Sequence, residues 1–165
     1  MENIVKLKLI TTAIIIAACF LSCAEKKQDD SKTKVDSNLQ KKQITIENIW
    51  TRVGAQKGNS AMYFDIVNNT PNNDTLISAS SSAADLVEIH ETFKKDKDRM
   101  GMRRVNSVPT PANSTTGFKP MGHHVMLIKL TGDLKTGDTV NAVLSFKYSD
   151  EIKIESIVKN MQIQH

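Results

Sequence analysis

The chain has 165 residues, a formal net charge of +4 at pH 7 and two cysteines. This positive charge is mild, and no pattern of basic and aromatic residues accompanies it, which argues against a nucleic acid partner. Both cysteines, Cys19 and Cys23, lie near the N-terminus. The rest of the chain therefore has neither the thiols of a reductase nor the His2Cys ligand set of a blue-copper redox centre.

Residues 1–22 have the pattern of a lipoprotein signal peptide. Lys6 and Lys8 precede an apolar stretch over residues 9–21, which is shorter than the roughly 20 apolar residues that a membrane span needs. We therefore expect this segment to direct export and not to cross the membrane in the mature protein.

The end of this segment indicates where a lipid would be attached. Residues 20–23 (FLSC) resemble a bacterial lipobox, in which the cysteine is lipid-modified and becomes the first residue of the mature protein. Cys19, which follows Ala17 and Ala18, is a competing site, but processing there would leave two large apolar residues at the mature terminus. We expect lipidation at Cys23, and an ordinary cleaved signal with a soluble product is the alternative.

Residues 23–42 are predicted to be a lipidated, flexible tether. From residue 24 to residue 42 the chain has six lysines and four acidic residues, with only Val35 and Leu39 as large aliphatic residues. Such a segment buries too little apolar area to offset the entropy lost on ordering. The tether leads to a domain over 43–162, and a domain of this length can form one hydrophobic core.

The pattern of this domain is typical of β-strands. Residues 140–148 alternate apolar and mostly polar side chains, and shorter runs at 44–46, 62–66, 87–89 and 152–154 repeat the alternation. Turn signals fall at 68–74, 109–111 and 131–138. Short strands with such turns predict an all-β antiparallel sandwich or barrel, in which we expect Trp50 to lie in the core.

Four residues of this domain form a candidate soft-metal ligand set: His90, Met102, His124 and Met126. Thioether sulfur and neutral imidazole suit Cu(I), whereas magnesium and calcium prefer oxygen ligands. Thiolates would bind copper more tightly, but outside the cytosol they are open to disulfide formation. A site of this composition therefore suits an oxidising compartment.

Strand geometry brings some of these side chains together. His124 and Met126 are two residues apart on a predicted strand, so they project from one face about 7 Å apart along the chain. Met100 and Met102 have the same relation, and His90 falls on the face opposite Val87 and Ile89. A methionine by itself is more often a flexible core residue, and a histidine by itself is more often a surface residue. Met62 and Met161 keep that interpretation, whereas the pairing of His124 with Met126 favours a metal.

The spacing of the four residues resembles a known family, the PCu(A)C-type periplasmic copper chaperones. In that family a His is followed by a Met twelve positions on and later by a His-x-Met motif, and all four positions match here. The resemblance extends over about residues 43–160, through residues 50–52 (WTR), 61–64 (AMYF), 87–91 (VEIHE), 102–103 (MR) and 122–127 (GHHVML).

The resemblance implies a cupredoxin-like Greek-key β-sandwich or barrel that binds one Cu(I) per domain. It implies delivery of copper to the binuclear copper site of a cytochrome oxidase, with a Sco-type protein as a second acceptor or helper. Family members often have a Met within two residues of the first His, where this chain has Glu91 and Thr92. Met100, Met121 and His123 lie near the proposed ligands and are candidate auxiliary ligands.

We therefore predict a copper chaperone of the bacterial cell envelope, lipid-anchored on the periplasmic side, whose reaction is ligand exchange. We do not expect an enzyme, because the chain has no Ser-His-Asp arrangement, phosphate-binding glycine loop or convincing pair of catalytic carboxylates. Two alternatives stay open. One is a copper-sequestering lipoprotein, which would bind further ions through Met100, Met121, His123 or His165. The other is a structural sandwich lipoprotein without metal.

Overall fold

The computed structural model describes residues 43–96 and 99–161. The predicted signal peptide (1–22), the tether (23–42), the lipidation site Cys23 and His165 lie outside the described residues. The described part of the chain consists of strands joined by turns, and none of it forms a helix long and apolar enough to span a membrane. The strands are β1 (Ile44–Arg52), β2 (Asn59–Asn68), β3 (Asp74–Ser80), β4 (Ala84–Lys94), β5 (Met100–Arg104), β6 (Val108–Thr110), β7 (Ser114–Phe118), β8 (His123–Leu130), β9 (Thr139–Phe146) and β10 (Ile152–Lys159).

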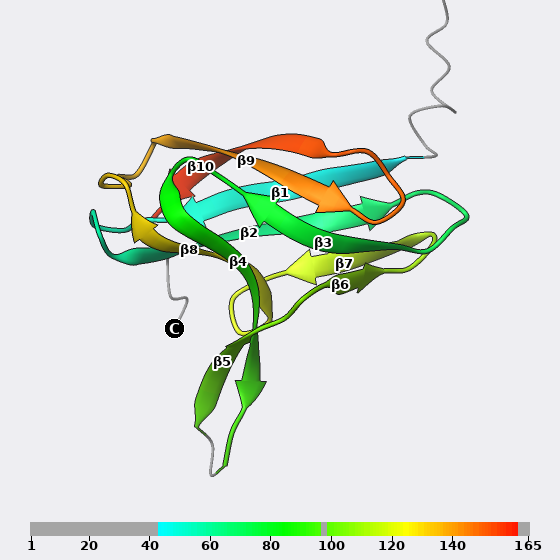
Figure 1. The fold of residues 1–165 in the computed structure, drawn as a ribbon, viewed down its shortest axis with the longest axis horizontal. Coiled ribbons are helices and arrows are strands. Elements are labelled where there is room, and N and C mark those ends of the chain that lie inside the picture. Colours follow the sequence, from blue (N-terminus) through cyan, green and yellow to red (C-terminus); the bar gives the residue numbers. More distant parts are fainter. Residues whose placement is uncertain (1–42, 97–98, 162–165) are drawn as a thin grey trace, which may run out of the picture. The chain divides into compact units, whose positions relative to one another are not determined.

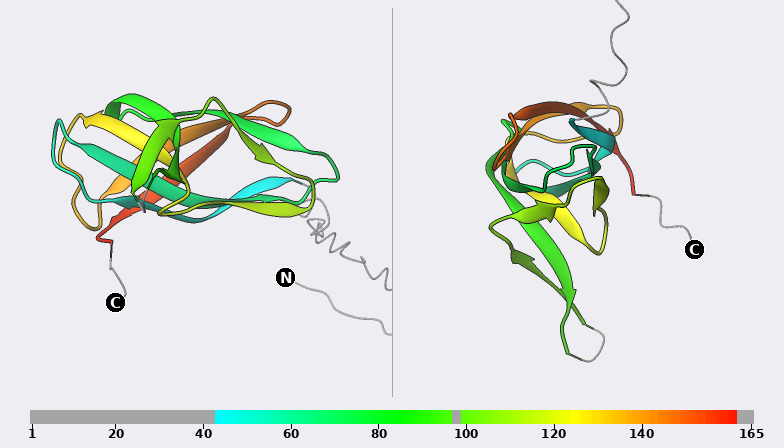
Figure 2. Two further views of the ribbon diagram at one scale, coloured as in Figure 1. Left: turned by 90° about the horizontal axis from the view of Figure 1, so that it is seen from below. Right: turned by 90° about the vertical axis from the view of Figure 1, so that its right-hand side faces the viewer.

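All ten strands belong to one hydrogen-bonded sheet, in the order β5-β4-β8-β7-β2-β1-β10-β9-β3-β6, and β8 also pairs with β2. Most neighbours are antiparallel, but β1 runs parallel to β10 and β7 meets β8 in parallel. The sheet curls on itself, so that its two halves enclose one interior (Figures 1 and 2). The prediction of an all-β sandwich or barrel is confirmed.

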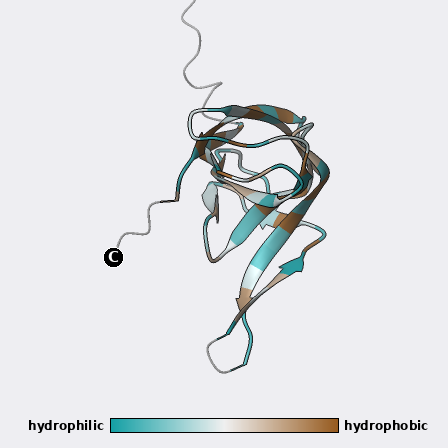
Figure 3. Ribbon diagram, turned by 90° about the vertical axis from the view of Figure 1, so that its left-hand side faces the viewer, coloured by the Kyte–Doolittle hydropathy of each residue, from teal (hydrophilic) through white to brown (hydrophobic). Residues whose placement is uncertain are grey.

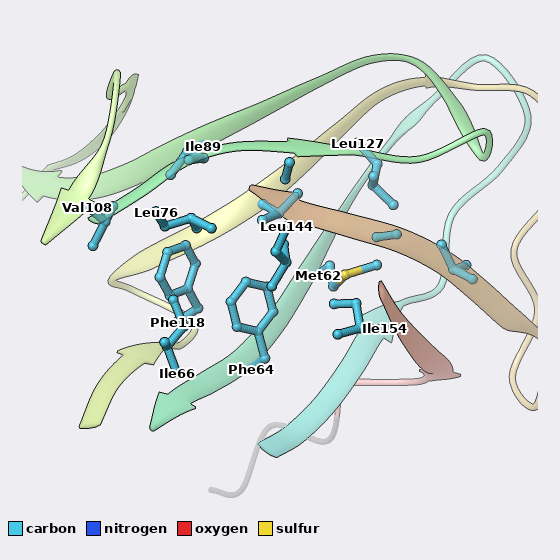
Figure 4. Packing of buried hydrophobic residues seen from close by; sticks show 14 of the residues in the cluster. Met62, Phe64, Ile66, Leu76, Ile89, Val108, Phe118, Leu127, Leu144 and Ile154 are labelled. Carbon is cyan, nitrogen blue, oxygen red and sulfur yellow. The ribbon is translucent and has the colours of Figure 1, made fainter. Parts of the chain in front are cut away.

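The core follows from the alternation of side chains along the strands. Figure 3 shows hydrophobic and hydrophilic residues succeeding each other along the ribbon. β2 and β9 each place alternate apolar side chains in the interior, where the Phe64 and Phe118 rings stack with their centroids 4.6 Å apart (Figure 4). The alternate buried residues of these two strands are Met62, Phe64, Ile66, Val140, Ala142, Leu144 and Phe146.

Three local expectations were wrong. Pro109 lies within β6 and not in a turn, which is possible because β6 is the last strand of the sheet, where a proline without an N–H breaks no ladder. Tyr148 does not continue the buried face of β9, because the strand ends at Phe146; its side chain is 72% exposed. Trp50 is only partly buried and packs against Tyr63 outside the core cluster, since its neighbour Thr51 is the residue that faces inward.

We expect Phe64→Ala to destabilise the fold by about 3–5 kcal/mol, because it removes a fully buried ring and leaves a cavity beside Phe118. Urea denaturation of the full-length chain would measure the change. Tyr148→Ala is the control, and as a surface substitution it should stay within about 0.5 kcal/mol. Equal effects of the two substitutions would contradict this description of the core.

Candidate metal centre

The register of β4 and β8 places two predicted ligands side by side. The two strands are antiparallel, and His90 is the direct partner of His124. Their neighbours Ile89 and Val125 are buried in the core, so both histidines project from the other face of the sheet. The two imidazole rings lie with their centroids 5.9 Å apart, at an angle of 54°.

His124 is almost completely buried, with 3% of its surface exposed. Its Nδ1 lies 3.1 Å from the carbonyl oxygen of Gly122. Because a carbonyl can only accept a hydrogen bond, Nδ1 carries the proton and Nε2 has the free lone pair. Burial lowers the pKa of His124 below its usual range; the Gly122 hydrogen bond opposes this shift, and the charges of His90, Arg52 and His123 add to it. The imidazole is thereby held in the neutral form that a metal requires.

His90 is oriented by a carboxylate. Its Nε2 lies 2.8 Å from Glu88 Oε2, and Arg104, on the neighbouring strand, approaches the other oxygen of Glu88 at 3.3 Å. When Glu88 is ionised it accepts the Nε2 proton, which leaves Nδ1 of His90 as the nitrogen with a lone pair. A carboxylate that holds a ligating histidine in this way is a common support of metal sites.

The methionines lie on the same face as the two histidines. Met126 is two residues beyond His124 on β8, and Met102 on β5 is the direct partner of Thr92, two residues beyond His90 on β4. β4 and β5 form a hairpin that extends beyond the rest of the sheet (Figure 1). Met102, Met126, His124 and Thr92 line one cavity of about 260 Å³. Its lining comprises Arg52, Ala61, Tyr63, Thr92, Met100, Gly101, Met102, Pro120, Met121, His124, Met126 and Met161.

The structure therefore brings Met102, His124 and Met126 to one cavity, with His90 beside His124. Of the auxiliary candidates, Met100 and Met121 also line this cavity. His123 does not: it alternates with His124 along β8, approaches Glu91 at 3.6 Å and lies near the Phe118 ring. The structure thus separates His123 from the proposed ligands.

Two neighbours of the site were not anticipated. Tyr63 on β2 is buried, and its ring centroid lies 6.1 Å from that of His124, so that it forms one wall of the cavity. Trp50 on β1, the neighbour of β2 on the side away from β8, packs against Tyr63 with the ring centroids 4.5 Å apart and the planes tilted by 31°. The alternation of Tyr63 with the core residues Met62 and Phe64 could have placed it on the outer face. Its position beside His124 depends on the β2–β8 pairing, which no local pattern indicates.

The donor set suits a soft ion. In the described ranges, no group of three or more His, Cys, Asp or Glu side chains is placed to hold a metal ion. The donors that do gather are imidazole nitrogens and thioether sulfurs, which prefer Cu(I). A larger hollow of about 730 Å³ lies over β9 and β10, between Asn141, Lys153 and Glu155, and no histidine or methionine lines it.

Two protein relatives match the chain. A Leifsonia xyli subsp. xyli protein with lipoprotein in its name is 28% identical over 103 residues, which cover 62% of this chain and 61% of that protein. The chain thus spans less than two thirds of the length of this relative. An uncharacterized protein of Rickettsia prowazekii is 27% identical over 161 residues, which cover 85% of this chain and 87% of that protein.

Solved PCuAC domains share the fold. The apo PCuAC domain from PmoF1 has a TM-score of 0.62 at 22% identity, covering 72% of this chain and 95% of that one. The copper-bound PCuAC domain from PmoF2 has a TM-score of 0.60 at 23% identity, covering 72% and 94%. The Cu(I) form of DR1885 from Deinococcus radiodurans has a TM-score of 0.54 at 25% identity, covering 70% and 78%.

These likenesses confirm the resemblance to PCu(A)C-type proteins and the cupredoxin-like fold. A family described as "Putative lipoprotein LpqE-like" matches residues 44–158, which is nearly the whole described domain. The chain therefore belongs to the LpqE-like family.

Proposed function

We propose that the chain is an extracytoplasmic metallochaperone that carries one Cu(I) ion as cargo and passes it to another protein. The observation that carries this proposal is the pairing of two imidazoles across β4 and β8, with methionine side chains gathered on the same face. The fold is shared with DR1885, whose structure was solved in a Cu(I) form, and with the copper-bound PCuAC domain from PmoF2.

The proposed ligands are Nδ1 of His90, Nε2 of His124 and the thioether sulfurs of Met102 and Met126. Cu(I) binds well to such a mixed nitrogen and sulfur set. The nitrogen half is fixed, since Glu88 and the Gly122 carbonyl hold the two rings. The sulfur half is more open, because the Met102 side chain is 62% exposed.

This asymmetry suits transfer by ligand exchange. An acceptor can approach the exposed sulfur side, and its own ligands can enter the copper shell before the histidines leave. No covalent bond of the protein changes, so the function requires no enzyme activity. The chain then acts by holding Cu(I) in a form that is protected but still accessible.

The acceptor and the location are also part of the proposal. The resemblance to PCu(A)C-type chaperones supports the binuclear copper site of a cytochrome oxidase, or a Sco-type protein, as the acceptor. Membership of the LpqE-like family and the lipobox-like residues 20–23 support a lipoprotein of the cell envelope, attached through Cys23 and facing the periplasm.

A copper-sequestering lipoprotein is the second candidate function. It is favoured by the further thioethers on the same cavity, Met100, Met121 and Met161. The stoichiometry separates the two functions, because a chaperone of this design binds one Cu(I), whereas a sequestering protein binds several.

The first test is an anaerobic Cu(I) titration of the full-length chain against a competing chelator. We expect one-to-one binding that is lost in Met102→Ala/Met126→Ala, because this variant removes both proposed sulfur ligands. Ile157→Ala, an exposed apolar residue of β10 outside the cavity lining, is the matched control and should bind as the wild type does. Absence of Cu(I) binding by the wild type would refute the proposed function.

A second prediction ranks two residues of the cavity. His124→Ala should weaken Cu(I) binding by more than the roughly 10–100-fold loss that is typical when a supporting group outside the ligand shell is removed. Met100→Ala should weaken it less, since Met100 is not among the four proposed ligands. The same titration measures both, with thermal unfolding as a check on folding, because His124 is buried. The reverse order would show that the ligand assignment is wrong.

A third prediction concerns pH. Copper and a proton compete for the same lone pair on His124, and burial lowers the pKa of this imidazole below the usual value of about 6.5. The neutral form therefore prevails at neutral pH and persists to a lower pH than in free histidine. We expect Cu(I) affinity to be constant near pH 7.5 and to fall as the pH drops through about 6 towards 5. Equal affinities at pH 5 and pH 7.5, measured with the same chelator, would contradict this.

A further inference from the structure

Met121 occupies a backbone position that disfavours its side chain. It is the third residue of a turn over 119–122, which the Gly122 N–H closes by donating to the Lys119 carbonyl at 3.0 Å. Pro120 is the second residue, and Met121 has a φ of 67°. A positive φ at the third position of such a turn favours glycine, because any side chain there crowds the backbone.

Packing does not explain the methionine either. Its side chain is 66% exposed, so it gains little from burial. Four other non-glycine residues in the described part of the chain have a positive φ, and all of them are polar: Asn48, Lys57, Asn113 and Lys129. Met121 is the one apolar residue of this group, and it places an exposed thioether on a disfavoured backbone.

The turn is attached to the metal-binding face. The carbonyl of Gly122, next to Met121, accepts hydrogen bonds from His124 Nδ1 at 3.1 Å and from the Thr92 N–H at 3.0 Å. The peptide group between Gly122 and His123 is thus held by β8 and β4 at once. Met121 lines the same cavity as His124, Met102 and Met126. The thioether sulfur is the atom of the Met121 side chain that can bind a soft metal ion in this cavity.

We propose that Met121 is a further sulfur ligand of the cargo Cu(I), supplied by the turn between β7 and β8. The inference rests on the proposed function and gives the site a third thioether, which exchanges with Met102 or Met126, because Cu(I) takes at most four such ligands. A soft thioether on an exposed turn can reach the ion from the solvent side while His90 and His124 hold it from the sheet.

Three substitutions in the full-length chain separate the sulfur from the backbone. Met121→Leu keeps an apolar side chain and the disfavoured φ but removes the sulfur. Met121→Gly removes the sulfur and relieves the backbone. Lys57→Gly is the matched control, because Lys57 is the third residue of a similar turn, with a φ of 63° and the Gly58 N–H donating to the Ala55 carbonyl at 2.9 Å, and does not line the cavity.

The measurements are anaerobic Cu(I) competition titrations, thermal unfolding, and NMR of chains with 13C-labelled methionine methyl groups. We expect both Met121 variants to bind Cu(I) about tenfold more weakly than the wild type, which corresponds to 1.4 kcal/mol. Met121→Gly and Lys57→Gly should unfold at a higher temperature than the wild type, and Lys57→Gly should keep wild-type affinity. The methyl resonance of Met121, assigned by its absence in Met121→Leu, should shift when one equivalent of Cu(I) is added.

Wild-type affinity in Met121→Leu, with an unmoved Met121 resonance in a wild type that binds Cu(I), would overturn the inference and leave the four-ligand proposal intact. A wild type that binds no Cu(I) would overturn both. The two failures are therefore distinguishable in one set of titrations.

Discussion

The antiparallel register of β4 and β8 is the constraint on which the site depends. It sets His90 directly opposite His124 and turns both away from a core to which their neighbours Ile89 and Val125 contribute. Because side chains alternate along a strand, a slip of one residue would move a histidine to the wrong face and expose core residues. The burial of the apolar face thus stabilises the register, and the register holds the two imidazoles together. The hydrophobic core and the candidate site are two faces of the same strand pair.

The site combines a buried half and an open half. His124 lies within the protein between Tyr63 and His90, whereas Met102 and Met121 stand at the exposed rim of the cavity. Buried, oriented nitrogens lower the cost of arranging the ligands when the ion binds, and exposed thioethers keep the ion within reach of a partner. A carrier needs both properties, since it must hold copper during transit and release it to another protein. Met102 is exposed because it lies on β5, in the hairpin that extends beyond the rest of the sheet (Figure 1), whereas His124 lies on β8 between β4 and β2.

Much of this could be predicted from local patterns. The alternation in β2 and β9 predicted the core, and the spacing of His124 and Met126 placed both on one face. β3 and β7 were not anticipated, because β7 (STTGF) is rich in small polar residues and has no clear alternation. Trp50 was wrongly expected in the core, and Tyr63 was not recognised as a neighbour of the site. The surroundings of both residues depend on the pairing of β1 with β2 and of β2 with β8. Contacts between strands that are far apart in the chain cannot be recognised from one amino-acid sequence, whereas side-chain alternation within one strand is local and can be recognised.

The central claim is that imidazole nitrogens and methionine sulfurs from three neighbouring strands meet on one Cu(I) ion. X-ray absorption spectroscopy of the full-length chain loaded with one equivalent of Cu(I) tests this most directly, because it distinguishes sulfur from nitrogen neighbours of the metal. We expect both kinds of neighbour around the copper, and we expect the sulfur contribution to fall in Met102→Ala/Met126→Ala. A copper shell of nitrogen and oxygen alone, unchanged in that variant, would contradict this claim.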